Sequence, residues 1–125
     1  MKNAVNWFEI PVTDFERAKK FYEQIFNYSM EVIIDEATFK MGLLSADQGA
    51  AGGAIVWNPA SYKPSSTEGV LVYLNGNPDL DEILNMVESA GGKILLAKRQ
   101  ISPQFGYMAL FVDSEGNRLA LHSNE

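Results

Sequence analysis

Residues 6–26 of this chain read NWFEIPVTDFERAKKFYEQIF, which predicts one strand turning directly into one amphipathic helix. In the strand, apolar residues alternate with the others and so share one face: Phe8, Ile10 and Val12. In the helix, apolar residues recur at i, i+3, i+4 and i+7: Ala18, Phe21, Tyr22 and Ile25. Thr13 and Glu16 predict a capping box where the helix begins. The other face of the strand is then free to carry function.

The same unit recurs at residues 70–90, VLVYLNGNPDLDEILNMVESA, which alternate first and then take up helical spacing. Asn77 is the expected cap of this second helix, and Pro78 its first residue. The chain between the helices and the chain after the second helix are each long enough for three strands. The sequence therefore predicts an α+β fold in which two βαβββ modules in tandem form curved mixed sheets around a cavity.

The module boundaries follow from a linker and from the period of the repeat. Residues 59–69 are rich in Pro, Ser and Gly, so module 1 is expected at about 4–58 and module 2 at about 70–123 of a single domain, 1–125. Equivalent residues of the first strands and of the closing strands are 64 positions apart, for example Ile10 with Leu74 and Ile55 with Leu119. The remaining strands are expected at residues 29–34, 37–44, 54–58, 93–99, 107–112 and 118–122, with a turn at 101–106. A ferredoxin-like dimeric barrel, the nearest competing fold, places fewer strands between its helices.

The composition limits the class of protein. The 125 residues are 46% hydrophobic and contain no Cys, which allows a core but no disulfide or thiolate chemistry. The formal net charge of −6, with no basic cluster, argues against nucleic acid as a partner. No apolar run approaches the length of a membrane span, and a strand pattern begins soon after Met1. We therefore expect a cytoplasmic protein that contacts no membrane.

Three separated motifs carry a resemblance to a known family: FEIPVTDFERAKKFY at 8–22, AGGKI at 90–94 and DSEGNRLALHS at 113–123. Together they resemble the glyoxalase/bleomycin-resistance/extradiol-dioxygenase family, also called the vicinal oxygen chelate family. The resemblance implies two βαβββ units, each a curved sheet around a cavity, and assembly as a homodimer. It also implies one of two kinds of site. Enzymes of the family bind a divalent metal through side chains on the first and fourth strands of each module, whereas other members bind small molecules without a metal.

The resemblance places the metal-ligand positions on four residues that cannot bind a metal: Trp7, Val56, Leu71 and Ala120. The chain also has a single His, so a site with two imidazoles is excluded. Asp and Glu oxygens could still hold a hard cation, but most of these residues fall in helix first turns and hairpin turns. We therefore expect that the family's metal site is lost, and we assign no cofactor.

Polar residues lie two positions further along each of these strands, on the same face: Glu9, Asn58, Tyr73 and His122. We expect Glu9 to lie beside Asn58 in module 1, above the apolar floor that the former ligand positions form. Tyr73 and His122 are expected side by side in module 2. A mostly apolar pocket with a few polar groups is typical of a small-molecule site. If Glu9 and His122 meet, they are candidates for a general base and a general acid.

Each of these residues also has a purely structural interpretation. Glu9 and His122 could be solvated ends of a strand and of the chain. Tyr73 could lie in the core or in a dimer interface, and Trp7 could pack in the core. Trp57 falls on the helix-facing side and is expected in the core.

The predicted turn at residues 101–106 carries two large apolar side chains, Ile101 and Phe105. Large apolar residues seldom face water as a group without a reason. We therefore expect them to cover the mouth of the cavity or a seam between two copies of the chain.

Two functional hypotheses from different classes remain. The first is a metal-independent binding protein, a homodimer that holds an aromatic or amphipathic small molecule in a β-lined cavity. The second is an enzyme of the family, a lyase, isomerase or dioxygenase with an unusual metal site or with acid–base chemistry of Glu9 and His122. A role in protein interaction alone is a third alternative. The sequence has no nucleophile-elbow motif and no dinucleotide-binding glycine motif after a strand.

Overall fold

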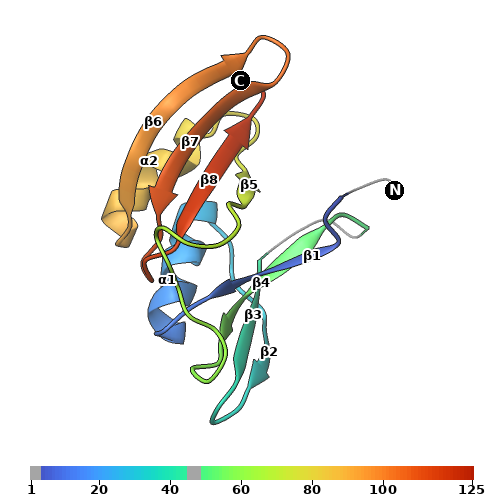
Figure 1. The fold of residues 1–125 in the computed structure, drawn as a ribbon, viewed down its shortest axis with the longest axis vertical. Coiled ribbons are helices and arrows are strands. Elements are labelled where there is room, and N and C mark those ends of the chain that lie inside the picture. The colour runs from blue at the N-terminus through green and yellow to red at the C-terminus, as the bar shows by residue number, and fades with distance from the viewer. Residues whose placement is uncertain (1–3, 45–48) are drawn as a thin grey trace.

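The computed structural model describes residues 4–44 and 49–125, which form two four-stranded mixed sheets with one helix against each (Figure 1). The first module contains, in chain order, β1 (Trp7–Pro11), α1 (Phe15–Phe26), β2 (Val32–Asp35), β3 (Lys40–Leu44) and β4 (Gly52–Trp57). The second contains β5 (Tyr73–Asn75), α2 (Asp81–Ala90), β6 (Lys93–Ser102), β7 (Gly106–Val112) and β8 (Arg118–Ser123). The predicted α+β class and the tandem βαβββ modules are confirmed.

The two sheets have the same topology, in the orders β1-β4-β3-β2 and β5-β8-β7-β6. In each sheet the first strand of the module pairs in parallel with the last, and the other pairs are antiparallel. The strands β1 and β5 are therefore edges, each hydrogen-bonded on one side only. Neither sheet closes into a barrel.

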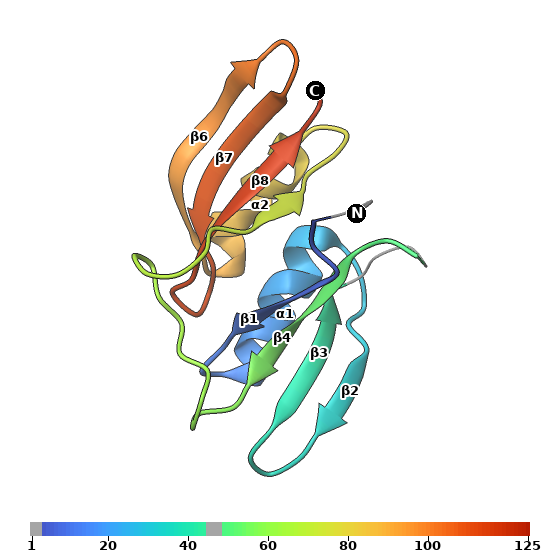
Figure 2. The ribbon, with the colours of Figure 1, turned by 45° about the vertical axis from the view of Figure 1, so that its right-hand side comes forward.

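The helices join the two modules into one core. Figure 2 shows both sheets in front of the two helices, and α1 and α2 pack against each other. Aromatic rings from both modules meet there, since Phe21 on α1 stacks on Phe111 of β7 with 6.3 Å between ring centres. The core cluster contains residues of every helix and of strands in both sheets. The faces of the sheets that point away from the helices are thus left for other contacts.

A buried carboxylate ties the turn between β7 and β8 to the start of α1. The side chain of Glu115 is 0% exposed, and its Oε1 accepts hydrogen bonds from the backbone amides of Thr13 (3.0 Å) and Asp14 (2.7 Å). The guanidinium of Arg17 lies 2.7 Å from its Oε2. The adjacent Asp113 accepts a hydrogen bond of 2.7 Å from the buried hydroxyl of Tyr22. These bonds fix how the modules sit relative to each other.

The helices begin later than the sequence predicts. Asp14, rather than Thr13, caps α1 by accepting a hydrogen bond from the Arg17 amide (3.1 Å), so the predicted capping box is wrong. Thr13 instead donates its amide and hydroxyl to Glu115, and its hydroxyl oxygen accepts from the Arg17 guanidinium (3.4 Å). The helix α2 begins at Asp81 and not at residue 78, which follows a cis peptide bond. At the start of this helix, the Leu80 amide donates to the hydroxyl of Ser123, and the Asp81 amide donates to the side chain of Asp79.

Several strands also differ in length from the prediction. β2 begins at Val32 rather than at residue 29, because the Met30 amide donates to the side chain of Glu23 (2.8 Å) and its own side chain is buried. β5 begins at Tyr73, and Val70, predicted to be in this strand, is 90% exposed. The turn predicted at 101–106 shrinks to residues 103–105, since bulges let β6 and β7 pair to their ends. No helix in the described ranges is long and apolar enough to cross a membrane.

We expect Glu115→Gln to lower the free energy of unfolding by about 2 kcal/mol at neutral pH, because it removes a buried charge from its donors. Burial alone would raise the pKa of Glu115, but it is outweighed by hydrogen bonds from Arg17, Asp14, Ser114 and Thr13, which lower the pKa. A lowered pKa in the folded state stabilises the protein above the unfolded pKa, and this stabilisation is lost as the pH falls through the folded pKa.

Denaturant titrations at pH 3 to 7 measure the free energy of unfolding of both proteins. The difference in this free energy between the wild type and Glu115→Gln should shrink as the pH falls. Glu16→Gln, on the exposed side of α1, is the matched control and should change stability little at any pH. If the difference in the free energy of unfolding between the wild type and Glu115→Gln stayed constant across this pH range, the ionised carboxylate of Glu115 would not be the source of the stabilisation.

Candidate functional site

The outer face of β1 carries a cluster of three side chains, Trp7, Glu9 and Tyr62, called here the Glu9 cluster. Because Ile10 is buried under α1, the alternating residues Trp7 and Glu9 point to the opposite side of the sheet. The indole Nε1 of Trp7 donates to Oε2 of Glu9 (3.2 Å), and the hydroxyl of Tyr62 donates to Oε1 (2.5 Å). Both oxygens of the carboxylate are thus held by neutral donors.

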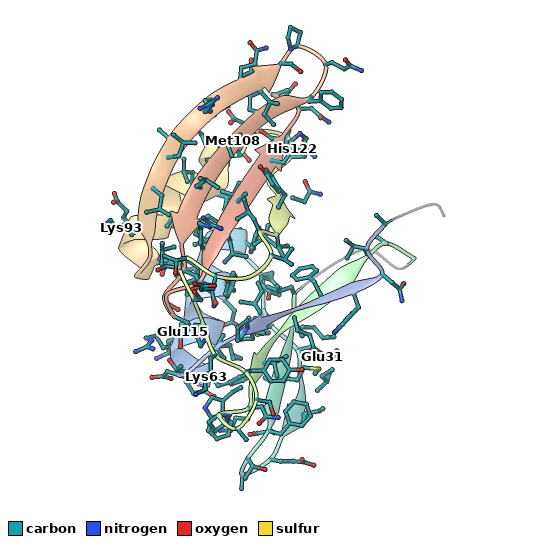
Figure 3. The ribbon with its side chains drawn as sticks, viewed as in Figure 1. Glu31, Lys63, Lys93, Met108, Glu115 and His122 are labelled. Carbon is teal, nitrogen blue, oxygen red and sulfur yellow. The ribbon has the colours of Figure 1, made fainter. Side chains whose placement is uncertain are left out.

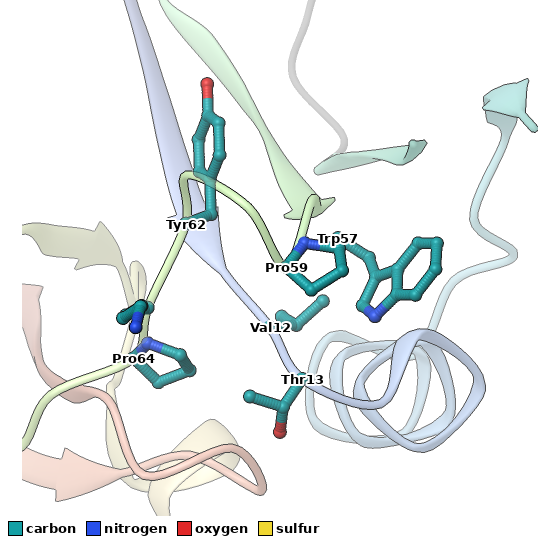
Figure 4. Close-up of a pocket in the computed structure, with 7 residues that line it drawn as sticks. Val12, Thr13, Trp57, Pro59, Tyr62 and Pro64 are labelled. Atoms are coloured by element: carbon teal, nitrogen blue, oxygen red, sulfur yellow. The ribbon is translucent and has the colours of Figure 1, made fainter. Parts of the chain in front are cut away.

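Tyr62 reaches this face because of a tight turn that follows β4. The carbonyl oxygen of Asn58 accepts hydrogen bonds from the amides of Ser61 (3.0 Å) and Tyr62 (2.9 Å), which folds the linker back on itself. Figure 4 shows the ring of Tyr62 running beside β1, with its hydroxyl directed away from the linker. The hydrogen bond to the Glu9 carboxylate, together with burial, raises the pKa of the Tyr62 phenol.

An apolar floor lies next to the Glu9 cluster. In the parallel register Glu9 is the partner of Ala54, and Pro11 is the partner of Val56. The neighbouring strand β3 adds Leu43 opposite Ala54, and Met41 opposite Val56. Along β1, β4 and β3, Glu9 is thus the one charged side chain on the outer face.

The register differs from the lateral neighbours expected in both modules. Glu9 lies opposite Ala54 and not beside Asn58, which follows the end of β4. In module 2, Tyr73 lies opposite Ala120, and His122 lies opposite Asn75 of β5. The two predicted pairs are therefore wrong. The 64-residue repeat relates one module to the other but says nothing about the offset between strands within a module.

The remaining candidates lie on or near sheet β5-β8-β7-β6. His122 Nε2 is 2.6 Å from the carbonyl oxygen of Phe105, which can only accept, so the imidazole donates and holds the β6–β7 turn to β8. The ring of Phe105 is itself 62% exposed. Tyr73 is half exposed, and Leu71 lies just before β5 and is half-buried. Figure 3 shows His122 and Glu115 at opposite ends of this sheet.

Glu9 and His122 belong to different sheets and are held by different partners. Both lie in the described part of the chain, and no hydrogen bond joins them. A single copy of the chain therefore does not assemble them as an acid–base pair.

A separate pocket of about 390 Å³ opens between the linker and the start of α1 (Figure 4). Its walls include Val12, Thr13, Trp57, Pro59, Tyr62 and Pro64. Lys63 adds an ammonium group at the rim. Trp57, which the sequence predicts in the core, is only half-buried, and its side chain lines this pocket. None of the ligand-binding residues suggested by the sequence lines it.

No group of three or more His, Asp and Glu side chains is placed to hold a metal ion within residues 4–44 and 49–125. Of the four positions that the resemblance equates with metal ligands, Trp7 bonds to Glu9, and Val56 and Ala120 are fully buried. These residues do not fit a divalent metal, since indole and hydrocarbon side chains offer it no donor atom.

Sequence reasoning missed Tyr62. The segment 59–69 was interpreted as a linker from its Pro, Ser and Gly content, and no periodicity places a linker residue over a strand. The available signal was a large aromatic side chain in an otherwise small and polar loop, where binding residues are often found.

The fold and the family agree with the resemblance seen in the sequence. Residues 4–121 match the model of the Glyoxalase/Bleomycin resistance protein/Dioxygenase superfamily. The chain belongs to this superfamily. No curated protein matches the sequence.

Solved structures with low sequence identity share the fold. Hypothetical protein SA1046 from S. aureus is 19% identical, with a TM-score of 0.66 over 97% of this chain and 94% of that one. A glyoxalase/bleomycin resistance protein/dioxygenase family enzyme from Burkholderia phytofirmans PsJN is 17% identical, with a TM-score of 0.67 over 96% and 98%. TnmS3, an antibiotic binding protein from Streptomyces sp. CB03234, is 23% identical, with a TM-score of 0.62 over 98% and 97%.

We expect Glu9→Gln to lower the pKa of Tyr62, because the anionic acceptor that favours the protonated phenol is replaced by a neutral one. Titration of ¹³Cζ-labelled tyrosines by NMR measures this directly. Tyr28, whose hydroxyl donates to the Leu43 carbonyl, serves as the internal control, and its ¹³Cζ chemical shift at neutral pH should be the same in both proteins. The same titration midpoint for Tyr62 in both proteins would mean that the bond to Glu9 does not form in solution.

Proposed function

We propose that this protein binds an aromatic or amphipathic small molecule without a divalent metal. The observation that carries the proposal is the Glu9 cluster beside its apolar floor. Apolar area with a few fixed polar groups is the usual composition of a small-molecule site. The two rings of the cluster supply rigid contact area, and the carboxylate supplies orientation.

TnmS3, described as an antibiotic binding protein, is consistent with this proposal, because it indicates that a protein of this fold can serve binding. The side chains at Trp7, Val56, Leu71 and Ala120 favour an organic ligand over a metal. Trp7 and Leu71 offer apolar surface where an enzyme of the family would offer donor atoms, and Val56 and Ala120 are buried hydrocarbon with no donor atom.

We further propose that a second copy of the chain completes the site. Six exposed apolar residues lie on or just before β1 and β5, at the end of β6 and in the β6–β7 turn: Val5, Trp7, Val70, Tyr73, Ile101 and Phe105. Four others lie on β2, α2 and β6: Val32, Ile33, Met86 and Leu95. The edge strands β1 and β5, like the opposite edges β2 and β6, also carry unpaired backbone groups, which favour contact with another chain. A homodimer would cover the first six of these residues and enclose the open outer faces of the sheets.

The alternative is an enzyme, a lyase, isomerase or dioxygenase that uses Glu9 and His122. The Burkholderia phytofirmans protein of the same fold is described as an enzyme, which favours this alternative. It has less support in this chain, because Glu9 and His122 are held apart by other partners. Stoichiometric Fe, Mn, Ni or Zn in protein purified without a histidine tag would favour the enzyme and contradict metal-free binding.

The binding proposal is tested with N-phenyl-1-naphthylamine, a neutral fluorescent aromatic probe. We expect saturable binding with one probe per chain and a rise in melting temperature, since a ligand at about 100 times its Kd adds about 2.7 kcal/mol of stability. Trp7→Ala should weaken binding by about tenfold or more through lost apolar contact.

The matched control is Met86→Ala, which truncates an exposed apolar side chain on α2, remote from the outer faces of the sheets, and should leave affinity unchanged. The proposal fails if the probe does not bind, or if Trp7→Ala and Met86→Ala bind it equally well.

Sedimentation velocity tests the assembly. We expect a dimer at micromolar concentration, and Phe105→Asp should weaken it by more than about tenfold, because a charge replaces an apolar ring at the covered surface. Met86→Asp is the control and should remain dimeric. A wild-type protein that sediments as a monomer at tens of micromolar would exclude the dimer.

A further inference from the structure

The charge of Glu9 has no counter-charge in the described part of the chain. The ion pairs found there involve five other carboxylates: Asp14, Glu23, Asp35, Asp79 and Glu115. Both donors to Glu9 are neutral, the indole of Trp7 and the hydroxyl of Tyr62. Lys63, next to Tyr62 along the linker, lines the neighbouring pocket and forms no ion pair with Glu9. Among residues 4–44 and 49–125, the negative charge of the cluster therefore has no ion-pair partner.

Elsewhere the protein combines a carboxylate, an aromatic ring and a cation. In module 2, Lys98 Nζ lies 2.8 Å from Oδ1 of Asp79 and 4.7 Å from the centre of the Tyr107 ring. Module 1 has a looser arrangement of the same kind, with distances of 3.6 and 5.7 Å, made of Lys40, Asp35 and Trp57. A cation in such a position gains from the carboxylate charge and from the electron-rich face of the ring.

The Glu9 cluster has the carboxylate and the rings of such an arrangement but no lysine. Trp7 is 45% exposed, so surface of its indole remains open to a ligand. Each oxygen of Glu9 accepts one hydrogen bond and keeps a further acceptor site, since a carboxylate has about four. A hard metal ion would need about six oxygen ligands, and Glu9 is the one carboxylate on this face of β1, β4 and β3. Compared with the arrangements around Lys98 and Lys40, the Glu9 cluster lacks a cation, and an organic cation fits it better than a metal ion.

We infer that the ligand of this protein carries a cationic nitrogen, a protonated amine or a quaternary ammonium group, bound against the carboxylate of Glu9 and the rings of Trp7 and Tyr62. This inference rests on the proposed function and narrows it to one class of ligand. The half-buried Met41 and Leu43 of β3, on the same face of the sheet, would then contact the uncharged part of the same molecule.

A pair of isosteric probes isolates the charge. 3-Hydroxyphenyltrimethylammonium and 3-tert-butylphenol have nearly the same shape and differ in a nitrogen cation against a carbon atom. Titration calorimetry and the shift of the Trp7 indole N–H resonance measure the affinity and the place of binding. We expect the cation to bind at least about tenfold more tightly than the neutral probe, through its contacts with a carboxylate and two rings.

Variants assign the preference to Glu9. Glu9→Gln should remove the preference for the cation, so that this variant binds the two probes with affinities within about twofold of each other. Glu36→Gln, in the exposed turn between β2 and β3, makes the same change in net charge and should keep the preference. Circular dichroism confirms that both variants are folded.

Three outcomes overturn the inference. Equal affinity for the two probes overturns it while leaving the proposed function intact, since an aromatic molecule still binds. A cation preference that survives in Glu9→Gln, or is lost in Glu36→Gln, assigns the charge effect to another place. If neither probe binds, the inference fails, and the proposed function fails with it only when N-phenyl-1-naphthylamine is not bound either.

Discussion

The burial of Ile10 and Val12 beneath α1 decides which way Glu9 points. Side chains of a strand alternate between its two faces, so packing these residues into the core places Trp7 and Glu9 on the outer face. A shift of one residue would bury a carboxylate and expose the core side chains, which is far more costly than any gain at the site. The Glu9 cluster thus follows from the same constraint that stabilises the module.

The second constraint is the set of buried hydrogen bonds that joins the β7–β8 turn of module 2 to α1 of module 1. Glu115 accepts hydrogen bonds from the start of α1, and Asp113 accepts one from Tyr22, so the turn of one module completes the helix of the other. Burial raises the pKa of Asp113 despite its hydrogen bonds, whereas the bonds to Glu115 lower its pKa. On acidification the loss of stability from Glu115 is therefore partly offset by Asp113. The joined helices leave both outer faces open to ligand and partner.

Local patterns in the sequence were enough to predict the α+β class, the tandem modules and the outward position of Glu9. Features that depend on distant contacts were not predictable. Asp14 and not Thr13 caps α1, and the amide and hydroxyl of Thr13 bond to Glu115, 102 positions away. The offset between β1 and β4 is set by sheet packing, so Glu9 meets Ala54 instead of Asn58. Tyr62 joins the cluster through a turn in a segment that has no periodic signal.

The central claim is that ligands bind at the Glu9 cluster and not in the pocket beneath the linker, and the two tryptophans distinguish these places. Trp7 belongs to the cluster, and Trp57 lines the pocket. A ¹H–¹⁵N NMR titration with N-phenyl-1-naphthylamine follows both indole N–H resonances in one sample. The account predicts that the resonance of Trp7 moves with saturation while that of Trp57 stays in place. Movement of the Trp57 resonance alone would contradict it.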